Sequence, residues 1–194
     1  ENAETLIEQI ALAADGTALL LGALRLENEK VLNSIVYMDQ NGVAKVVYDK
    51  HHLVPFGEYL PFEHWLDRIG LGFTSDLFGT GFAAGEGPKR INIAPLGAVV
   101  PLICYEAVFP QDVSFASQEA AILLLLTNDA WFGGFAGPQQ HLAQAKMRSI
   151  EQGLPMIRVA NTGISAMIDP YGRSLKQLGL NTAGFIDAQV PQPA

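Results

Sequence analysis

The chain contains a single cysteine, Cys104, at the end of an apolar run that starts at residue 97. We predict a strand over residues 98–103 and a short helix after it, which would place the thiol close to helix N-terminal N–H groups that favour the thiolate. A thiolate at the end of a strand is well placed to act as a nucleophile. The alternative interpretation is a buried, unreactive thiol, because cysteine is often buried in protein cores.

A lysine and a glutamate are the second candidate group. Lys50 ends a predicted strand over residues 43–49 and precedes a loop that contains Glu58. At the end of a strand, a lysine can stabilise an oxyanion, and a neighbouring carboxylate can orient it. Alternatively, Lys50 is an ordinary solvated side chain and Glu58 a turn residue.

Several other chemistries are not supported by the sequence. His51 and His52 are adjacent, and neighbouring side chains of an extended segment point in opposite directions, so we expect no metal site and no cofactor. A Gly-x-Ser-x-Gly elbow, a phosphate-binding loop and a dinucleotide fingerprint are all absent from the sequence. These absences argue against the common serine hydrolase and nucleotide-binding classes.

Composition narrows the class of partner. The 194 residues are 49% hydrophobic and 16% charged with a formal net charge of −8, so we expect one hydrophobic core and no nucleic-acid ligand. No apolar run reaches the roughly 20 residues that cross a bilayer, and the first residues are acidic, unlike a signal peptide. A single cysteine cannot form an intrachain disulfide, so it assigns no compartment.

The elements that position these residues can be predicted from the hydrophobic pattern. Helices are expected over residues 3–14, 113–119 and 139–152. Strands are expected over residues 17–25, 31–38, 43–49, 98–103, 121–126, 156–160, 165–168, 174–178 and 185–188, the first of them buried. Residues 51–90 are expected to be irregular and to form a lid. Fully apolar strands alternating with helices indicate a layered α/β sandwich in a single domain, residues 1–194.

Three segments resemble the carbon-nitrogen hydrolase (nitrilase) superfamily: Tyr48–Glu58 (YDKHHLVPFGE), Ile103–Glu106 (ICYE) and Thr127–Gly133 (TNDAWFG). Within that superfamily, the loop VPFGEYLPF, the helix start GPQQH and the segment RVANTGIS are similar to the apolipoprotein N-acyltransferase family. The resemblance runs nearly from end to end. It implies a nitrilase-type α-β-β-α sandwich.

The resemblance also implies a reaction and a place in the cell. Such enzymes use a cysteine thioester to move a fatty acyl group from a phospholipid to the amine of diacylglyceryl-cysteine in apolipoproteins. The domain would face the periplasm at the bacterial inner membrane, as the C-terminal part of a longer membrane protein. By resemblance, Cys104, Lys50 and Glu58 are catalytic, whereas Tyr105, Glu106 and Trp131 shape the substrate pocket.

One part of the superfamily pattern is not found in this sequence. The family triad contains a glutamate in a Pro-Glu motif on an N-terminal strand, and none of the first glutamates lies in such a motif. We therefore expect weak or no turnover by this chain alone.

Two other functions remain open on the sequence alone. One is a soluble nitrilase-like amidase, in which water resolves the acyl-enzyme. The other is a non-enzymatic module that retains the scaffold. The aromatic loop over residues 56–82 favours the membrane enzyme, because many exposed aromatic side chains are costly unless they meet lipid.

Overall fold

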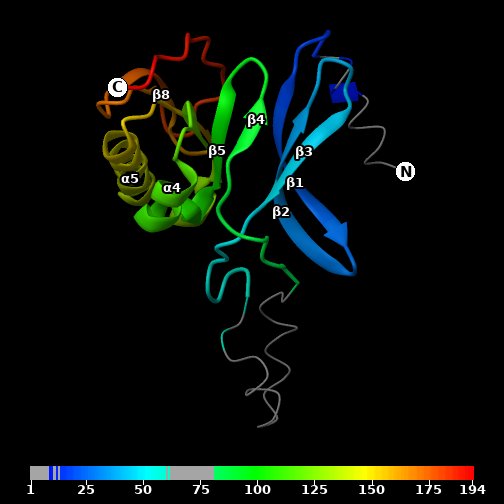
Figure 1. The fold of residues 1–194 in the computed structure, drawn as a ribbon. Coiled ribbons are helices and arrows are strands. Elements are labelled where there is room, and N and C mark those ends of the chain that lie inside the picture. The colour runs from blue at the N-terminus through cyan, green and yellow to red at the C-terminus, as the bar shows by residue number, and fades with distance from the viewer. Residues whose placement is uncertain (1–8, 11, 13, 60, 62–80) are drawn as a thin grey trace. The chain divides into compact units, whose positions relative to one another are not determined.

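A computed structural model of the chain describes residues 9–194 except residues 11, 13, 60 and 62–80 (Figure 1). The chain divides into two compact units, residues 1–87 and residues 88–194. The predicted helix over residues 3–14 and most of the aromatic loop over residues 56–82 lie outside the described residues.

The first unit contains an antiparallel sheet of three strands in the order β1-β2-β3, with bounds β1 (Leu19–Glu27), β2 (Lys30–Met38) and β3 (Ala44–Asp49). All three were predicted. β1 and β2 are joined by Asn28 and Glu29, both with positive φ (50° and 64°), as a two-residue hairpin with the right twist requires.

The expectation that the first strand is buried is wrong. Leu24 and Leu26 of β1 are 66% and 76% exposed, whereas Ile35 of the central strand β2 is 1% exposed. Leucine content alone did not distinguish an edge strand from a central one, because burial of a strand depends on its neighbours. The described residues between β3 and Arg90 form no long element, as expected.

The second unit contains a six-stranded sheet in the order β4-β5-β6-β7-β8-β9. Its elements are β4 (Ile91–Ile93), β5 (Gly97–Ile103), η1 (Cys104–Val108), α4 (Pro110–Ala116), β6 (Ile122–Asn128), η2 (Asp129–Phe132), α5 (Gly137–Gln152), β7 (Met156–Asn161), β8 (Ser165–Ile168) and β9 (Ser174–Leu178). β5, β6 and β7 are parallel, and the remaining pairs are antiparallel. The predicted alternation of strand and helix is therefore confirmed.

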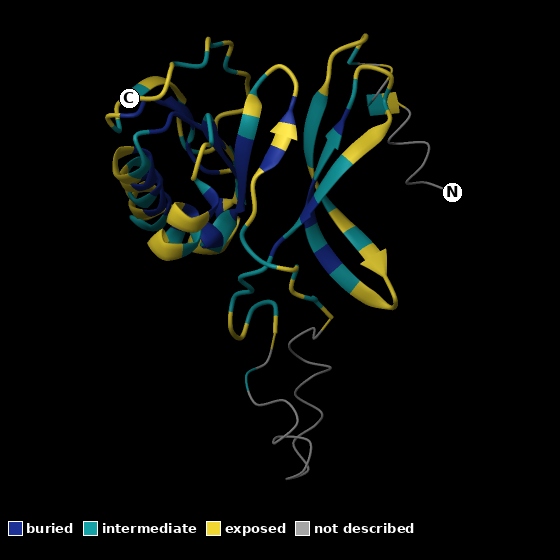
Figure 2. Ribbon diagram, viewed as in Figure 1, coloured by how far each residue is buried: buried dark blue, intermediate teal, exposed yellow. Residues whose placement is uncertain are grey.

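The core of this unit lies between the sheet and its helices, where buried strand residues meet apolar residues of α4 and α5 (Figure 2). Every second residue of the strands contributes, which is the period of a sheet face. The cluster includes Val100, Leu102, Leu123, Leu125, Val113, Leu142 and Ala145. This packing fixes the carboxyl ends of β5 and β6, where the candidate residues lie.

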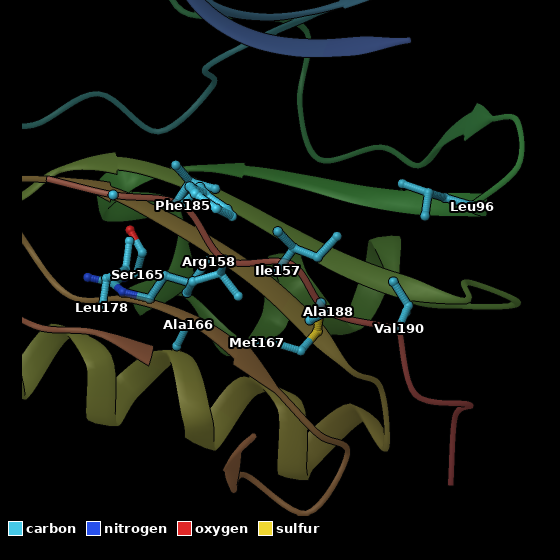
Figure 3. Close-up of a pocket in the computed structure, with 13 residues that line it drawn as sticks. Leu96, Ile157, Arg158, Ser165, Ala166, Met167, Leu178, Phe185, Ala188 and Val190 are labelled. Atoms are coloured by element: carbon cyan, nitrogen blue, oxygen red, sulfur yellow. The ribbon is translucent and has the colours of Figure 1, made fainter. Parts of the chain in front are cut away.

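Two boundaries differ from the predictions. The predicted helix over residues 113–119 is α4, which begins three residues earlier because Pro110 occupies the first helical turn and ends before Ser117. Residues 185–188, predicted as a strand, have no ladder partner. Three of them, Phe185, Ile186 and Ala188, line a cavity of about 400 Å³ together with Ile157 and Met167 of the sheet (Figure 3). β4 was not predicted, because three residues carry too little periodicity.

None of the helices in the described part of the chain is long and apolar enough to cross a membrane.

Candidate active site

Cys104 lies where β5 ends and the short helix η1 begins, as predicted. Its φ is +50°, a left-handed conformation that a residue with a side chain rarely adopts. The thiol is partly buried. A backbone held in such a conformation at a strand end is often found where the side chain has a chemical role.

Glu106 holds the peptide group that joins Leu102 to Ile103, one residue before the cysteine. Its carboxylate accepts a hydrogen bond of 2.7 Å from the backbone N–H of Ile103, the residue before η1. A glutamate at the third helical position commonly reaches back in this way. Glu106 is 1% exposed, and its predicted contact with substrate stays a prediction.

His141 holds the peptide group that joins Cys104 to Tyr105. Its Nε2 lies 3.2 Å from the carbonyl oxygen of Cys104, and its Nδ1 lies 2.9 Å from Asp129 Oδ1. The other oxygen of Asp129 accepts a hydrogen bond of 2.6 Å from Arg158 Nη2. η2, α5 and β7 thus each contribute one side chain to a buried cluster behind the cysteine.

The charged groups of this cluster interact strongly with one another, because the side chains of Asp129 and Arg158 are fully buried. Burial by itself raises the pKa of Asp129, but the hydrogen bond with His141 and the charge of Arg158 outweigh it and lower that pKa. Burial also lowers the pKa of Arg158, while Asp129 acts in the opposite direction. The carboxylate is therefore the stable form of Asp129 at neutral pH.

Sequence reasoning assigned no role to Asp129, His141 or Arg158, although all three lie in segments that carried the family resemblance. One signal was available for Arg158, since a charged residue inside an apolar strand must be paired when it is buried. Its partners could not be identified, because Asp129 and His141 are 29 and 17 residues away in sequence.

Lys50 and Glu58 are brought together within the first unit. Lys50 Nζ lies 2.7 Å from Glu58 Oε1 and 2.6 Å from Oε2, and Glu58 Oε2 also accepts a hydrogen bond of 2.8 Å from the backbone N–H of Val54. Lys50 is 1% exposed, so the interpretation of a solvated lysine is wrong. Cys104 belongs to the other unit, and joint action of the three residues stays a prediction.

The two aromatic candidates differ in exposure. Tyr105 packs edge-to-face on Phe109, with ring centroids 5.0 Å apart. Trp131 is 77% exposed, while the next residue, Phe132, lies 5.4 Å from the ring of His141. Trp131 therefore contributes little to the core of its own unit.

His51 and His52 do not point apart as expected. Their ring centroids are 5.4 Å apart, because the chain bends here instead of continuing the extended strand. His51 Nδ1 lies 2.9 Å from the hydroxyl of Tyr48, a buried residue of β3.

Proteins of known sequence are similar to this chain over most of its length. It is 42% identical over 199 residues to a protein named apolipoprotein N-acyltransferase from Rhodopseudomonas palustris, covering 99% of this chain and 37% of that protein. A protein of the same name from Brucella melitensis is 43% identical over 185 residues, covering 92% of this chain and 35% of its own length. The chain thus spans little more than a third of these relatives.

Solved structures share the fold. A variant of an amidase from Nesterenkonia sp. AN1 matches with a TM-score of 0.67 at 20% identity, covering 91% of this chain and 63% of that chain. A carbon-nitrogen hydrolase from Helicobacter pylori G27 matches with a TM-score of 0.66 at 18% identity and the same coverage. These matches confirm the predicted nitrilase-type α/β fold class. The sequence matches the carbon-nitrogen hydrolase family over residues 3–194, and the chain belongs to that family.

Proposed function

We propose that this chain is the nitrilase-like part of an apolipoprotein N-acyltransferase. The enzyme would move a fatty acyl group from a phospholipid, through a cysteine thioester, to the N-terminal amine of diacylglyceryl-cysteine. The observation that carries the proposal is identity above 40%, over nearly the whole chain, to proteins of that name. The strand-end position and left-handed backbone of Cys104 support a role as the nucleophile.

The proposed reaction has two covalent steps. In the first, the Cys104 thiolate attacks the ester carbonyl of the phospholipid, the C–O bond breaks, and the lysophospholipid alkoxide leaves and takes up a proton. In the second, the acceptor amine attacks the thioester, loses a proton and releases the thiolate. Each step passes through a tetrahedral intermediate with a negatively charged oxygen.

Lys50 and the backbone N–H of Tyr105 are proposed to stabilise this oxyanion. Support for Lys50 comes from its burial together with Glu58, since a buried ammonium group needs a fixed counter-charge and gives a preorganised positive charge in return. Glu58 is proposed to keep the ammonium group oriented. Tyr105, Glu106 and Trp131 are proposed to shape the pocket for the acyl chain and the acceptor.

A membrane partner follows from the proposed donor, because phospholipid is available only at a bilayer. We propose that the domain acts at the periplasmic face of a bacterial inner membrane, within a longer membrane protein. Two exposed aromatic residues in and just after η2 support contact with lipid: Trp131 is 77% and Phe135 is 91% exposed. Exposed aromatic side chains are typical of surfaces that meet the membrane interface.

Intact mass measurement after incubation with phospholipid vesicles tests the thioester step. The chain and its Cys104→Ala variant would be compared, because Cys104 is the only cysteine in the sequence. A fatty acyl mass that appears on the wild type and not on the variant is the expected result. Release of that mass by a diacylglyceryl-cysteine peptide, faster than by buffer, separates acyl transfer from the water-driven hydrolysis of an amidase.

If no adduct forms on this chain, the same measurement is made on the longer natural protein. Acylation of the longer protein at Cys104 would mean that this chain alone lacks a needed part. No acylation of either protein would contradict the proposed function.

A further inference from the structure

We propose that Asp129, His141 and Arg158 are positioning residues for Cys104, and that His141 does this as a positively charged imidazolium that donates from both ring nitrogens. The inference rests on the proposed role of Cys104 as the nucleophile. It concerns three residues that lie behind the reacting thiol and were not among the predicted site residues.

The two ring nitrogens of His141 both face acceptors. Nδ1 lies 2.9 Å from a carboxylate oxygen of Asp129, and Nε2 lies 3.2 Å from the carbonyl oxygen of Cys104. A carbonyl oxygen can only accept, and a neutral imidazole has a single N–H. Both contacts are hydrogen bonds at the same time when the ring carries two protons.

Asp129 is held as a carboxylate by its other neighbours. Arg158 Nη2 donates to Oδ2 at 2.6 Å, and Thr127 Oγ1 donates to Oδ1 at 3.1 Å. Protonating Asp129 would leave a fully buried guanidinium without its counter-charge, which is strongly unfavourable. Arg158 Nη2 is also 3.3 Å from His141 Nδ1, and it carries two N–H groups. The contact of Nδ1 with the carboxylate oxygen of Asp129 is shorter, at 2.9 Å, and that contact is a hydrogen bond only when Nδ1 is the donor.

The resulting cluster contains one negative and two positive groups. Its net charge of one positive unit is buried directly behind η1, and Arg158 Nη1 is buried with no hydrogen-bond partner among the described residues. The two positive groups favour a thiolate at Cys104, whereas the buried carboxylate of Glu106, two residues along η1, acts in the opposite direction. The hydrogen bond to the Cys104 carbonyl also fixes the peptide group at the residue with φ of +50°.

Alkylation kinetics test the positioning role without any lipid. Iodoacetamide would report on Cys104 alone, as the chain has no other cysteine. His141→Phe, which removes both donors, is expected to slow alkylation at neutral pH by roughly tenfold or more, the scale of one hydrogen bond to a charged group. His141→Gln keeps a donor near the position of Nε2 and is expected to recover part of that loss.

Ser149→Ala is the matched control on the same helix. Ser149 is fully buried in α5, and its hydroxyl has no hydrogen-bond partner within the described part of the chain. Cys104 of the Ser149→Ala variant should be alkylated at the wild-type rate. Far-UV circular dichroism and thermal unfolding of each variant show whether a slower alkylation comes from unfolding of the protein or from lost positioning of Cys104.

Side-chain ¹⁵N NMR of the wild type tests the charge and needs no variant. Proton couplings at both nitrogens of His141 at neutral pH are expected. A single protonated nitrogen would overturn the imidazolium, and a folded His141→Phe variant that alkylates as fast as the wild type would overturn the positioning role. If alkylation and NMR agree with the inference but no acyl adduct forms, the proposed acyl transfer fails and the positioning cluster stands.

Discussion

Lys50 Nζ contacts both carboxylate oxygens of Glu58, at 2.7 and 2.6 Å, although the lysine is almost completely buried. A buried ion pair of this kind is a poor source of net stability, because removing the two charges from water costs about as much as their attraction returns. Its retention is better explained by the fixed positive charge that it provides. That charge is the feature that the proposed oxyanion stabilisation requires.

Removing one member of this pair is predicted to be far more harmful than removing both. Lys50→Met leaves the Glu58 carboxylate without its counter-charge, and we expect a loss of about 3–5 kcal/mol in the free energy of unfolding. The double variant Lys50→Met with Glu58→Gln should recover much of that loss, while acyl transfer stays abolished in both. Chemical denaturation and acylation assays on the same samples measure the two effects.

An exposed ion pair gives the control for this cycle. Glu119 lies 3.0 Å from Arg90 Nη2 and its side chain is 83% exposed, so Glu119→Gln should change the unfolding free energy by about 0–1 kcal/mol. If Lys50→Met were as mild as Glu119→Gln, the buried pair would not hold a preorganised charge.

Gly163 is predicted to be required for the Asp129 cluster. A Cβ atom at Gly163 would lie 2.2 Å from Asp129 Oδ2 and 2.7 Å from Asp129 Cβ, much closer than real contacts. Gly163→Ala must therefore displace a fully buried carboxylate, and we expect about 1–3 kcal/mol of destabilisation, as overpacking of a core typically causes. Cys104 alkylation should slow in the same variant.

Gly134→Ala is the control for that substitution, because a Cβ at Gly134 would meet nothing within 4 Å. Thermal unfolding and iodoacetamide kinetics on the two variants give the comparison. Equal behaviour of the two alanine variants would mean that the close approach of Gly163 to Asp129 has no effect on either property.

Local patterns predicted the elements around Cys104 better than the contacts within them. The strand before Cys104 and the helix after it follow from an apolar run and its end, which are properties of adjacent residues. Lys50 and Glu58 are eight residues apart in a single loop, so their pairing was also within reach of sequence reasoning. These predictions are confirmed.

Burial and long-range pairing were not predictable in the same way. The exposure of Leu24 and Leu26 depends on β1 being an edge strand, which its own composition does not determine. The contact between His141 and the Cys104 carbonyl joins residues 37 positions apart and depends on how α5 packs against η1. A residue's type indicates which partner it needs, but the fold determines which partner it finds.

Stability in acid is predicted to depend on Asp169. Burial acts to raise the pKa of this carboxyl, but hydrogen bonds from the backbone and side chain of Arg173 and from the backbone of Tyr171 lower it below its ordinary value. Because the folded-state pKa lies below the unfolded value of about 3.9, the carboxylate contributes stability above that pH. The contribution is lost as pH falls through the folded-state value.

Asp169→Asn removes the titrating group while keeping a side-chain oxygen that can accept from Tyr171 and Arg173. The free energy of unfolding should be lower in the variant at pH 7, and the difference from wild type should narrow below about pH 4. Urea unfolding of both proteins between pH 3 and pH 7 measures this difference in unfolding free energy. A difference that stays constant over that whole range would contradict the role of the Asp169 carboxylate.

Trp131 is predicted to act on substrate and not on stability. Its side chain is 77% exposed, so Trp131→Ala should change the unfolding free energy by less than about 0.5 kcal/mol, as surface substitutions usually do. If the indole contacts the acyl chain or the acceptor, the same variant should slow thioester formation from phospholipid vesicles about tenfold or more. Phe115 of α4, 68% exposed, provides a matched aromatic control that should leave thioester formation unchanged when replaced by alanine. Equal rates for the two variants would remove Trp131 from the proposed substrate pocket, because a general loss of exposed aromatic surface would then explain both.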